Sequence, residues 1–335
     1  MKHVNPITAL LKALAALAAA APALSNAHVK WFNEYDVTAA PLHIGSVIGN
    51  PLFLILLALS AIAIFAVISI DNRLAPPPFV DAIDERGMRH AGPFMRYSVA
   101  LFFMTLQVTD LRVILTPELE IDSTIVTLLQ IAIAGLALFK ATAFLAGLGM
   151  IALYGIAAHH YGLFHLLDYT IFVGIAIFLI IESLRPGKYT FASLMVLRVA
   201  TSFTLLWGAV EKFAYPDTFY RLLDQYPYLS FGLDREFFLL SAGFVEFACA
   251  YLILFGRLSS KLGIVVLLGF FVLAVIPFGA VDAIGHWLFA ASLLALLATR
   301  NRFEVKAPSR VNTALYLCGM PSMFTCYYGA QYVLH

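Results

Sequence analysis

Charged residues are scarce in this chain. They make up 12% of its 335 residues and balance to a net charge of +1, whereas apolar residues make up 61%. A soluble domain carries about a quarter charged residues, and a nucleic-acid-binding domain carries a basic surface. The composition therefore excludes an ordinary soluble enzyme, a disordered chain and a nucleic-acid partner. It is typical of a protein whose main partner is the lipid bilayer.

Cysteine and the common catalytic motifs are also missing. The three cysteines show no C-x-x-C spacing, which excludes a disulfide framework and a thiolate zinc site. The sequence contains no P-loop, no Rossmann G-x-G-x-x-G, no G-x-S-x-G and no H-E-x-x-H. These absences argue against a nucleotide-driven pump and leave open whether the protein is an enzyme.

The amino end, residues 1–27, is typical of a signal peptide. Lys2 and Lys12 are basic, residues 13–21 are apolar but too short to span a bilayer, and Ser25-Asn26-Ala27 resembles a cleavage site. An uncleaved anchor is the alternative. Residues 28–50, which follow, are predicted to form a periplasmic amphipathic segment.

Cleavage after Ala27 would make His28 the new amino terminus. An amino-terminal histidine can bind copper through its amine and its ring nitrogen, an arrangement that resembles the histidine brace of copper monooxygenases. His28 is therefore a candidate copper ligand. The alternative is that it is simply the first residue after the cut.

Apolar stretches along the rest of the chain predict an all-α bundle of nine or ten membrane-spanning helices. The predicted helices cover residues 51–70, 97–117, 123–139, 141–158, 166–183, 191–210, 237–256, 262–281, 285–299 and 311–331. The first is an isolated membrane helix, residues 71–96 are predicted as a cytoplasmic loop, and the C-terminal helix (311–335) could instead lie on the membrane surface. Lys and Arg concentrate in alternate connections, which places the mature N-terminus outside the cytoplasm.

Polar positions within the apolar helices repeat along the chain. They divide it into two tandem four-helix units of the same orientation, residues 97–183 and 191–299. An arginine lies close to the start of each unit, and a second polar residue follows fourteen positions later. A third polar residue lies nine positions before a phenylalanine. The matched residues are Arg96 with Arg198, Asp110 with Lys212, and Gln130 with Glu246.

The second unit carries a recognisable set of motifs. They are Arg198, the run Gly208 to Phe213 (GAVEKF), the run Gly243 to Phe247 (GFVEF), and Leu254-Phe-Gly256 before a basic turn. This pattern resembles the DoxX-like family of small four-helix membrane proteins, and the first unit resembles it weakly. The resemblance implies a multi-pass protein of the bacterial inner membrane that is associated with a redox system.

Ionisable residues at membrane depth are costly unless they are paired, so they are the candidate site residues. The candidate catalytic residues are Glu246, Lys212, Asp282 and His286; Glu211 and Asp110 are candidate cofactor-binding residues; His28, His159, His160, His165 and Asp168 are candidate metal ligands.

Two of these pairs have helical spacing. His165 and Asp168 are three residues apart, and Asp282 and His286 are four apart, so each pair would share a helix face. A carboxylate beside a histidine supports metal ligation or proton transfer. The alternative is histidines that bond to loop carbonyls. Glu246 lies in mid-helix, and Lys212 is its expected partner across the bundle. The alternative for this pair is that it only fixes helix register.

These patterns predict a redox-associated membrane protein whose periplasm-facing His/Asp/Glu/Lys cluster binds a metal, with copper as the candidate, or a quinone. Two alternatives are open: a scaffold subunit that anchors a membrane or periplasmic redox partner, and a transporter of a small solute or metal. The reaction, the substrate and the oligomeric state do not follow from the sequence.

Overall fold

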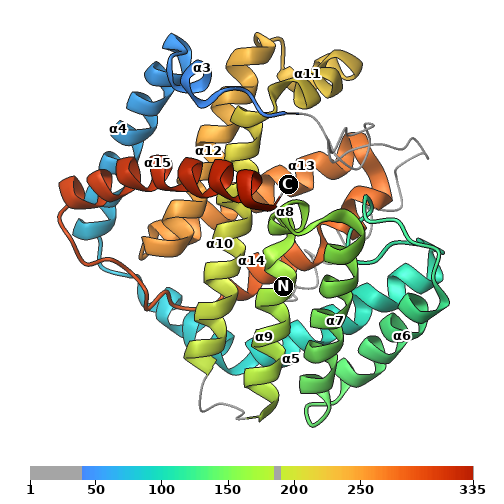
Figure 1. The fold of residues 1–335 in the computed structure, drawn as a ribbon. Coiled ribbons are helices and arrows are strands. Elements are labelled where there is room, and N and C mark those ends of the chain that lie inside the picture. The colour runs from blue at the N-terminus through green and yellow to red at the C-terminus, as the bar shows by residue number, and fades with distance from the viewer. Residues whose placement is uncertain (1–39, 185–189, 335) are drawn as a thin grey trace, which may run out of the picture.

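The computed structural model describes residues 40–184 and 190–334, and Figure 1 shows their arrangement. The predicted signal peptide, His28 and residues 28–39 of the predicted amphipathic segment lie outside the described residues. Within them the fold is helical, and the only β-type pairing in these two ranges is an isolated bridge between Val113 and Glu120.

Each predicted helical range contains a helix. The elements are α3 (Ile44–Ile48), α4 (Pro51–Arg73), α5 (Pro78–Val108), α6 (Thr124–Leu138), α7 (Ala143–Tyr161), α8 (Leu163–Leu166), η1 (Leu167–Tyr169), α9 (Thr170–Leu184), α10 (Thr190–Ala214), α11 (Pro216–Gln225), η2 (Pro227–Ser230), α12 (Arg235–Phe255), α13 (Ser259–Gly285), α14 (Trp287–Leu297) and α15 (Ser309–Leu334).

Six described segments are long and apolar enough to cross a bilayer: α4, α7, the α8–α9 segment, α10, α12 and α13. Two further helices, α6 and α14, are apolar but shorter. Helices of this length and composition bury their backbone polar groups and expose apolar side chains, as a bilayer requires. The all-helical fold with these six candidate spans is compatible with a multi-pass membrane protein, and the count of nine or ten spans stays a prediction.

The expected loop over 71–96 is wrong for most of its length. Only residues 74–77 separate α4 from α5, and residues 78–96 form the first part of α5. Pro78 occupies the first turn, where its missing N–H is no loss, and Asp81 lies near the positive helix end. The polar residues that suggested a loop belong to a helix on which Asp84 is buried and binds Lys261 at 2.6 Å.

The expected helix over 97–117 ends early. Helix α5 stops at Val108, and residues 109–123 form a compact connection. In it Ile114 N–H donates to Leu119 O at 2.8 Å, and both side chains are fully buried. The connection therefore packs into the bundle.

Sequence neighbours pack side by side through most of the bundle. Helices α5, α6, α7 and α9 pack in that order, as do α10, α12, α13 and α14. The two series meet where α9 packs on α10 and where α14 packs on α5. Helices α4 and α15 pack against each other and against the second series, and Figure 1 shows them on the side away from α6 and α7.

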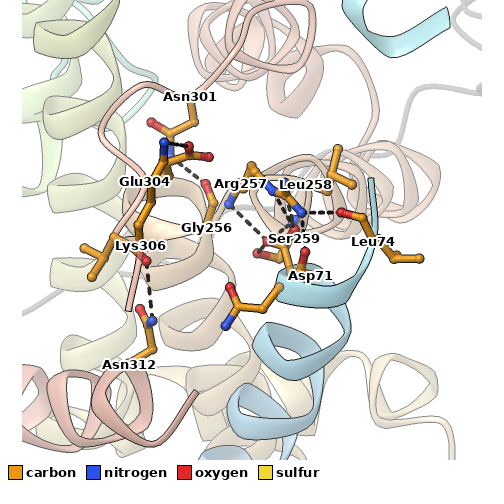
Figure 2. Close-up of polar contacts among 12 residues, drawn as sticks. Asp71, Leu74, Gly256, Arg257, Leu258, Ser259, Asn301, Glu304, Lys306 and Asn312 are labelled. Atoms are coloured by element: carbon orange, nitrogen blue, oxygen red, sulfur yellow. Dashed lines mark hydrogen bonds and ion pairs between the residues drawn. The ribbon is translucent and has the colours of Figure 1, made fainter. Parts of the chain in front are cut away.

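Asp71 links helix α4 to the start of helix α13 at one end of the bundle (Figure 2). Its carboxylate accepts the backbone N–H groups of Arg257, Leu258 and Ser259 at 3.0–3.1 Å, as well as the Ser259 hydroxyl. The Arg257 guanidinium donates in return to the carbonyls of Asp71 and Leu74. These contacts cap the start of α13 with a side chain from α4.

Asn301 fixes the same end after α14. Its side-chain amide donates to the carbonyls of Leu254 and Gly256 at 3.1 and 2.7 Å, where α12 ends (Figure 2). The free carbonyls of a helix end need such donors when they are buried. Asp71 therefore accepts hydrogen bonds from the backbone N–H groups of the α12–α13 turn, and Asn301 donates to its backbone carbonyls.

Candidate functional site

Glu118 and His165 form a buried pair at the opposite end of the bundle. His165 Nε2 lies 2.8 Å from Glu118 Oε1, and their side chains are only 11% and 7% exposed. The Tyr169 hydroxyl donates to the same carboxylate oxygen at 2.5 Å. Histidine and tyrosine thus share one acceptor, an arrangement that orients the imidazole.

The 109–123 connection carries Glu118 to this position. Gln130 on α6 donates from its amide to the carbonyls of Val113 and Ile114 at 2.7 and 3.0 Å. Leu119, next to Glu118, is fully buried. The Gln130 hydrogen bonds and the buried Leu119 side chain therefore hold the 109–123 connection in place, and with it the Glu118 carboxylate beside His165.

Aromatic rings enclose His165. The Tyr161 ring stacks on it with centroids 6.1 Å apart, and the Tyr161 hydroxyl donates to Glu120 O at 2.6 Å. This contact links the end of α7 to the 109–123 connection.

Asp282 and His286 form the second pair, where α13 meets α14. His286 Nδ1 lies 3.1 Å from Asp282 Oδ1, and the Asp282 side chain is completely buried. The His286 ring stacks on Phe271 with centroids 4.5 Å apart. Helix α13 breaks at Gly279, whose φ of 73° is easily adopted only by glycine, shortly before Asp282.

The two histidine pairs lie at the same end of the bundle. Phe172 in the first turn of α9 contacts Phe289 in the first turn of α14, with ring centroids 6.3 Å apart. Tyr169 contacts Phe172, and Phe289 contacts His286. With the His165–Tyr169 contact, four ring contacts of 6.1–6.5 Å connect the two histidines. The pairs are therefore within three helix diameters, or about 30 Å.

Lys212 and Glu246 form an ion pair between α10 and α12. Lys212 Nζ lies 2.5 Å from Glu246 Oε2, and both side chains are 19% exposed. The ammonium also donates to Gly208 O at 3.3 Å and lies 5.3 Å from the centre of the Phe219 ring. The structure thus brings together the two residues that the sequence predicts as partners.

The remaining predicted residues differ in their exposure. Asp110 is exposed at the end of α5, where its φ is 50°, and pairs loosely with Arg112 at 3.8 Å. His159 and His160 are exposed at the end of α7. Glu211 is buried on α10, and Asp168 is half-buried on η1.

The metal prediction finds no support in the described residues. No group of three or more His, Cys, Asp or Glu side chains in residues 40–184 and 190–334 is arranged to hold a metal ion. His165 has its short contact to the Glu118 carboxylate, and His159 and His160 face outward. The candidate copper ligand His28 is outside these ranges.

Glu118, Tyr169 and Gln107 take part in these contacts but are not among the site residues predicted from the sequence. The side-chain amide of Gln107 donates to Gln130 at 2.9 Å. In the predicted repeat Gln130 matches Glu246 and Asp110 matches Lys212. The partner of Gln130 is nevertheless Gln107 and not Asp110. Glu118 lies in an acidic stretch that reads as an exposed loop. Its apolar neighbours Leu115 and Leu119, both fully buried, are the signal that this stretch packs inward.

A hollow of about 320 Å³ opens beside α11. Tyr220, Arg235 and Asp224 line it, and Arg235 binds the Asp224 carboxylate at 2.8 Å while lying 4.8 Å from the Tyr220 ring centre. Burial, together with the negative charge of Glu236, raises the pKa of Tyr220. The phenol thus stays protonated at neutral pH and remains a hydrogen-bond donor.

Searches of this chain against protein-family models, curated proteins and solved structures give no match.

Proposed function

We propose that the chain is a DoxX-like inner-membrane protein of two tandem four-helix units, and that its histidine–carboxylate end binds the head group of a membrane quinone. The single observation that carries the proposal is the Phe172–Phe289 contact, because it brings one histidine–carboxylate pair from each unit to one end of the bundle. The quinone head would interact with His165 and His286.

Matching contacts in the two helix series support the repeat. Arg96 donates to Leu138 O near the end of α6 at 3.1 Å, and Arg198 donates to Ile253 O near the end of α12 at 2.6 Å. Each arginine thus binds the last turn of the second long helix in its unit. The Gln107–Gln130 bond and the Lys212–Glu246 pair then bridge the same two helices in each unit.

The chemistry of the two pairs suits a quinone. A neutral imidazole can donate its N–H to a quinone carbonyl, and a carboxylate beside it can take up the proton that a quinol releases. The rings of Tyr169, Phe172 and Phe289 are buried between the pairs and make their surroundings apolar. This combination of apolar rings and few polar groups is typical of a small-molecule site.

Tryptophan fluorescence tests this proposal. Trp287 follows His286 directly and donates to Ser98 O at 3.2 Å, and quinones quench indole emission at short range. We expect a short-chain quinone to quench the detergent-purified protein saturably. His165→Ala and His286→Ala should each weaken binding about tenfold, which corresponds to the loss of one buried hydrogen bond.

His159→Ala is the matched control, because this histidine is exposed near the same end. It should leave the quinone affinity unchanged. Quenching of the wild type that rises linearly without saturation would refute the proposal, and so would equal effects of the His159 and His286 substitutions.

A further inference from the structure

Three arginines converge at the end of the bundle away from the histidine pairs. Arg198, Arg300 and Arg302 line one small hollow between α10 and the segment that follows α14. Among the described residues none of the three has a carboxylate within 4 Å. Guanidinium groups keep their charge in proteins, so the hollow is positive. The Asp84 carboxylate acts on Arg198 only from a distance and is paired with Lys261.

Arg198 is built into the site. Its side chain is only 3% exposed, and one of its terminal nitrogens donates to Ile253 O and to Ser260 Oγ at 2.6 and 2.7 Å. These bonds fix the guanidinium, and Arg198 is one of the residues that line the hollow. A fixed, buried arginine is the usual partner of a phosphate group.

The 300–303 segment is held in place as well. Asn301 is buried and anchored to the end of α12, and its side-chain oxygen accepts the Phe303 N–H at 2.9 Å. Arg300 and Arg302 flank this anchor and are exposed. Their side chains can therefore reach a ligand without any rearrangement of the backbone.

Apolar side chains form the rim of the same hollow. Phe191 and Phe303 are 39% and 38% exposed, and the Arg302 guanidinium lies 5.7 Å from the centre of the Phe191 ring. A free phosphate ion would make no favourable contact with these apolar side chains, whereas the acyl chains of a lipid would pack on them. Basic hollows between membrane helices bind anionic lipid head groups in this way.

We infer that this hollow binds the phosphodiester of an anionic phospholipid, with its acyl chains along Phe191 and Phe303. The inference does not depend on the quinone proposal, because it concerns the opposite end of the bundle.

Native mass spectrometry of the detergent-purified protein tests the inference. The probes are phosphatidylglycerol, phosphatidylcholine with the same acyl chains, and inorganic phosphate. We expect phosphatidylglycerol to bind more tightly than the other two. Arg300→Ala and Arg302→Ala should each weaken its binding about fivefold, the effect of one arginine near an anionic head group.

Arg310→Ala is the control, because it removes an exposed arginine from outside the hollow, near the start of α15. It should change the phosphatidylglycerol affinity by less than twofold. Arg302→Lys keeps the charge and should bind with intermediate affinity. Equal binding of phosphatidylcholine, displacement of the lipid by millimolar phosphate, or an Arg310→Ala effect as large as that of Arg302→Ala would each overturn the inference.

Discussion

Single residues at membrane depth differ in how completely their charge is balanced. Lys212 and Glu246 neutralise each other, and the pair is mostly shielded from solvent. Arg112 and Asp122 also form a contact of 2.9 Å, but their side chains are 62% and 83% exposed. Removing one partner from a pair of the first kind is strongly destabilising, because the remaining charge is left without a counter-ion. Pairs of the second kind contribute little to stability.

Lys212→Met should lower the free energy of unfolding by about 3 kcal/mol, because it leaves the Glu246 carboxylate without its counter-ion. The measurement is thermal unfolding in detergent. The double variant Lys212→Met with Glu246→Gln should recover part of this loss, since no charge then remains. Asp122→Asn is the exposed control and should change stability by less than about 0.5 kcal/mol. A double variant less stable than Lys212→Met alone would contradict the stranded-charge explanation.

Glycine allows a close approach between helix α5 and the residue that follows α14. A Cβ placed on Gly87 of α5 would overlap the carbonyl oxygen of Ala298, just after α14. Gly135 on α6 has no heavy atom within 4 Å of such a Cβ. A glycine-to-alanine substitution therefore creates a steric clash on α5 but none on α6.

Gly87→Ala should destabilise the protein, because the α5–α14 contact must open to admit the methyl group. Gly135→Ala should be neutral or stabilise it by up to about 1 kcal/mol, because alanine favours a helix more than glycine does. Thermal unfolding of the two variants under the same detergent conditions measures the difference. Equal unfolding temperatures would show that α5 and α14 do not need this close approach.

The molecule as a whole has two chemically different ends. One carries the histidine–carboxylate pairs, and the other carries Asp71, Asn301 and the arginine hollow. We propose from the positive-inside rule that the basic end faces the cytoplasm. The histidine end would then face the periplasm.

Labelling with a membrane-impermeant maleimide tests this orientation in intact cells. In a background with Cys249, Cys318 and Cys326 replaced by serine, His159→Cys should react from outside. Arg310→Cys should react only after the membrane is permeabilised. Both positions are exposed, so a difference in reactivity reports the side of the membrane. Labelling of Arg310→Cys alone in intact cells would reverse the proposed orientation.

Sequence alone indicated the all-helical class and the approximate position of the predicted helices other than 97–117, because hydrophobic length is a local property that the bilayer selects. It also paired Lys212 with Glu246 and Asp282 with His286. Only the tertiary structure showed that 78–96 is helical and that Glu118 turns inward to His165. The reason is physical: a charged segment can be a loop or the polar face of a helix, and the choice depends on partners such as Lys261 and Tyr169 that lie far away in the chain.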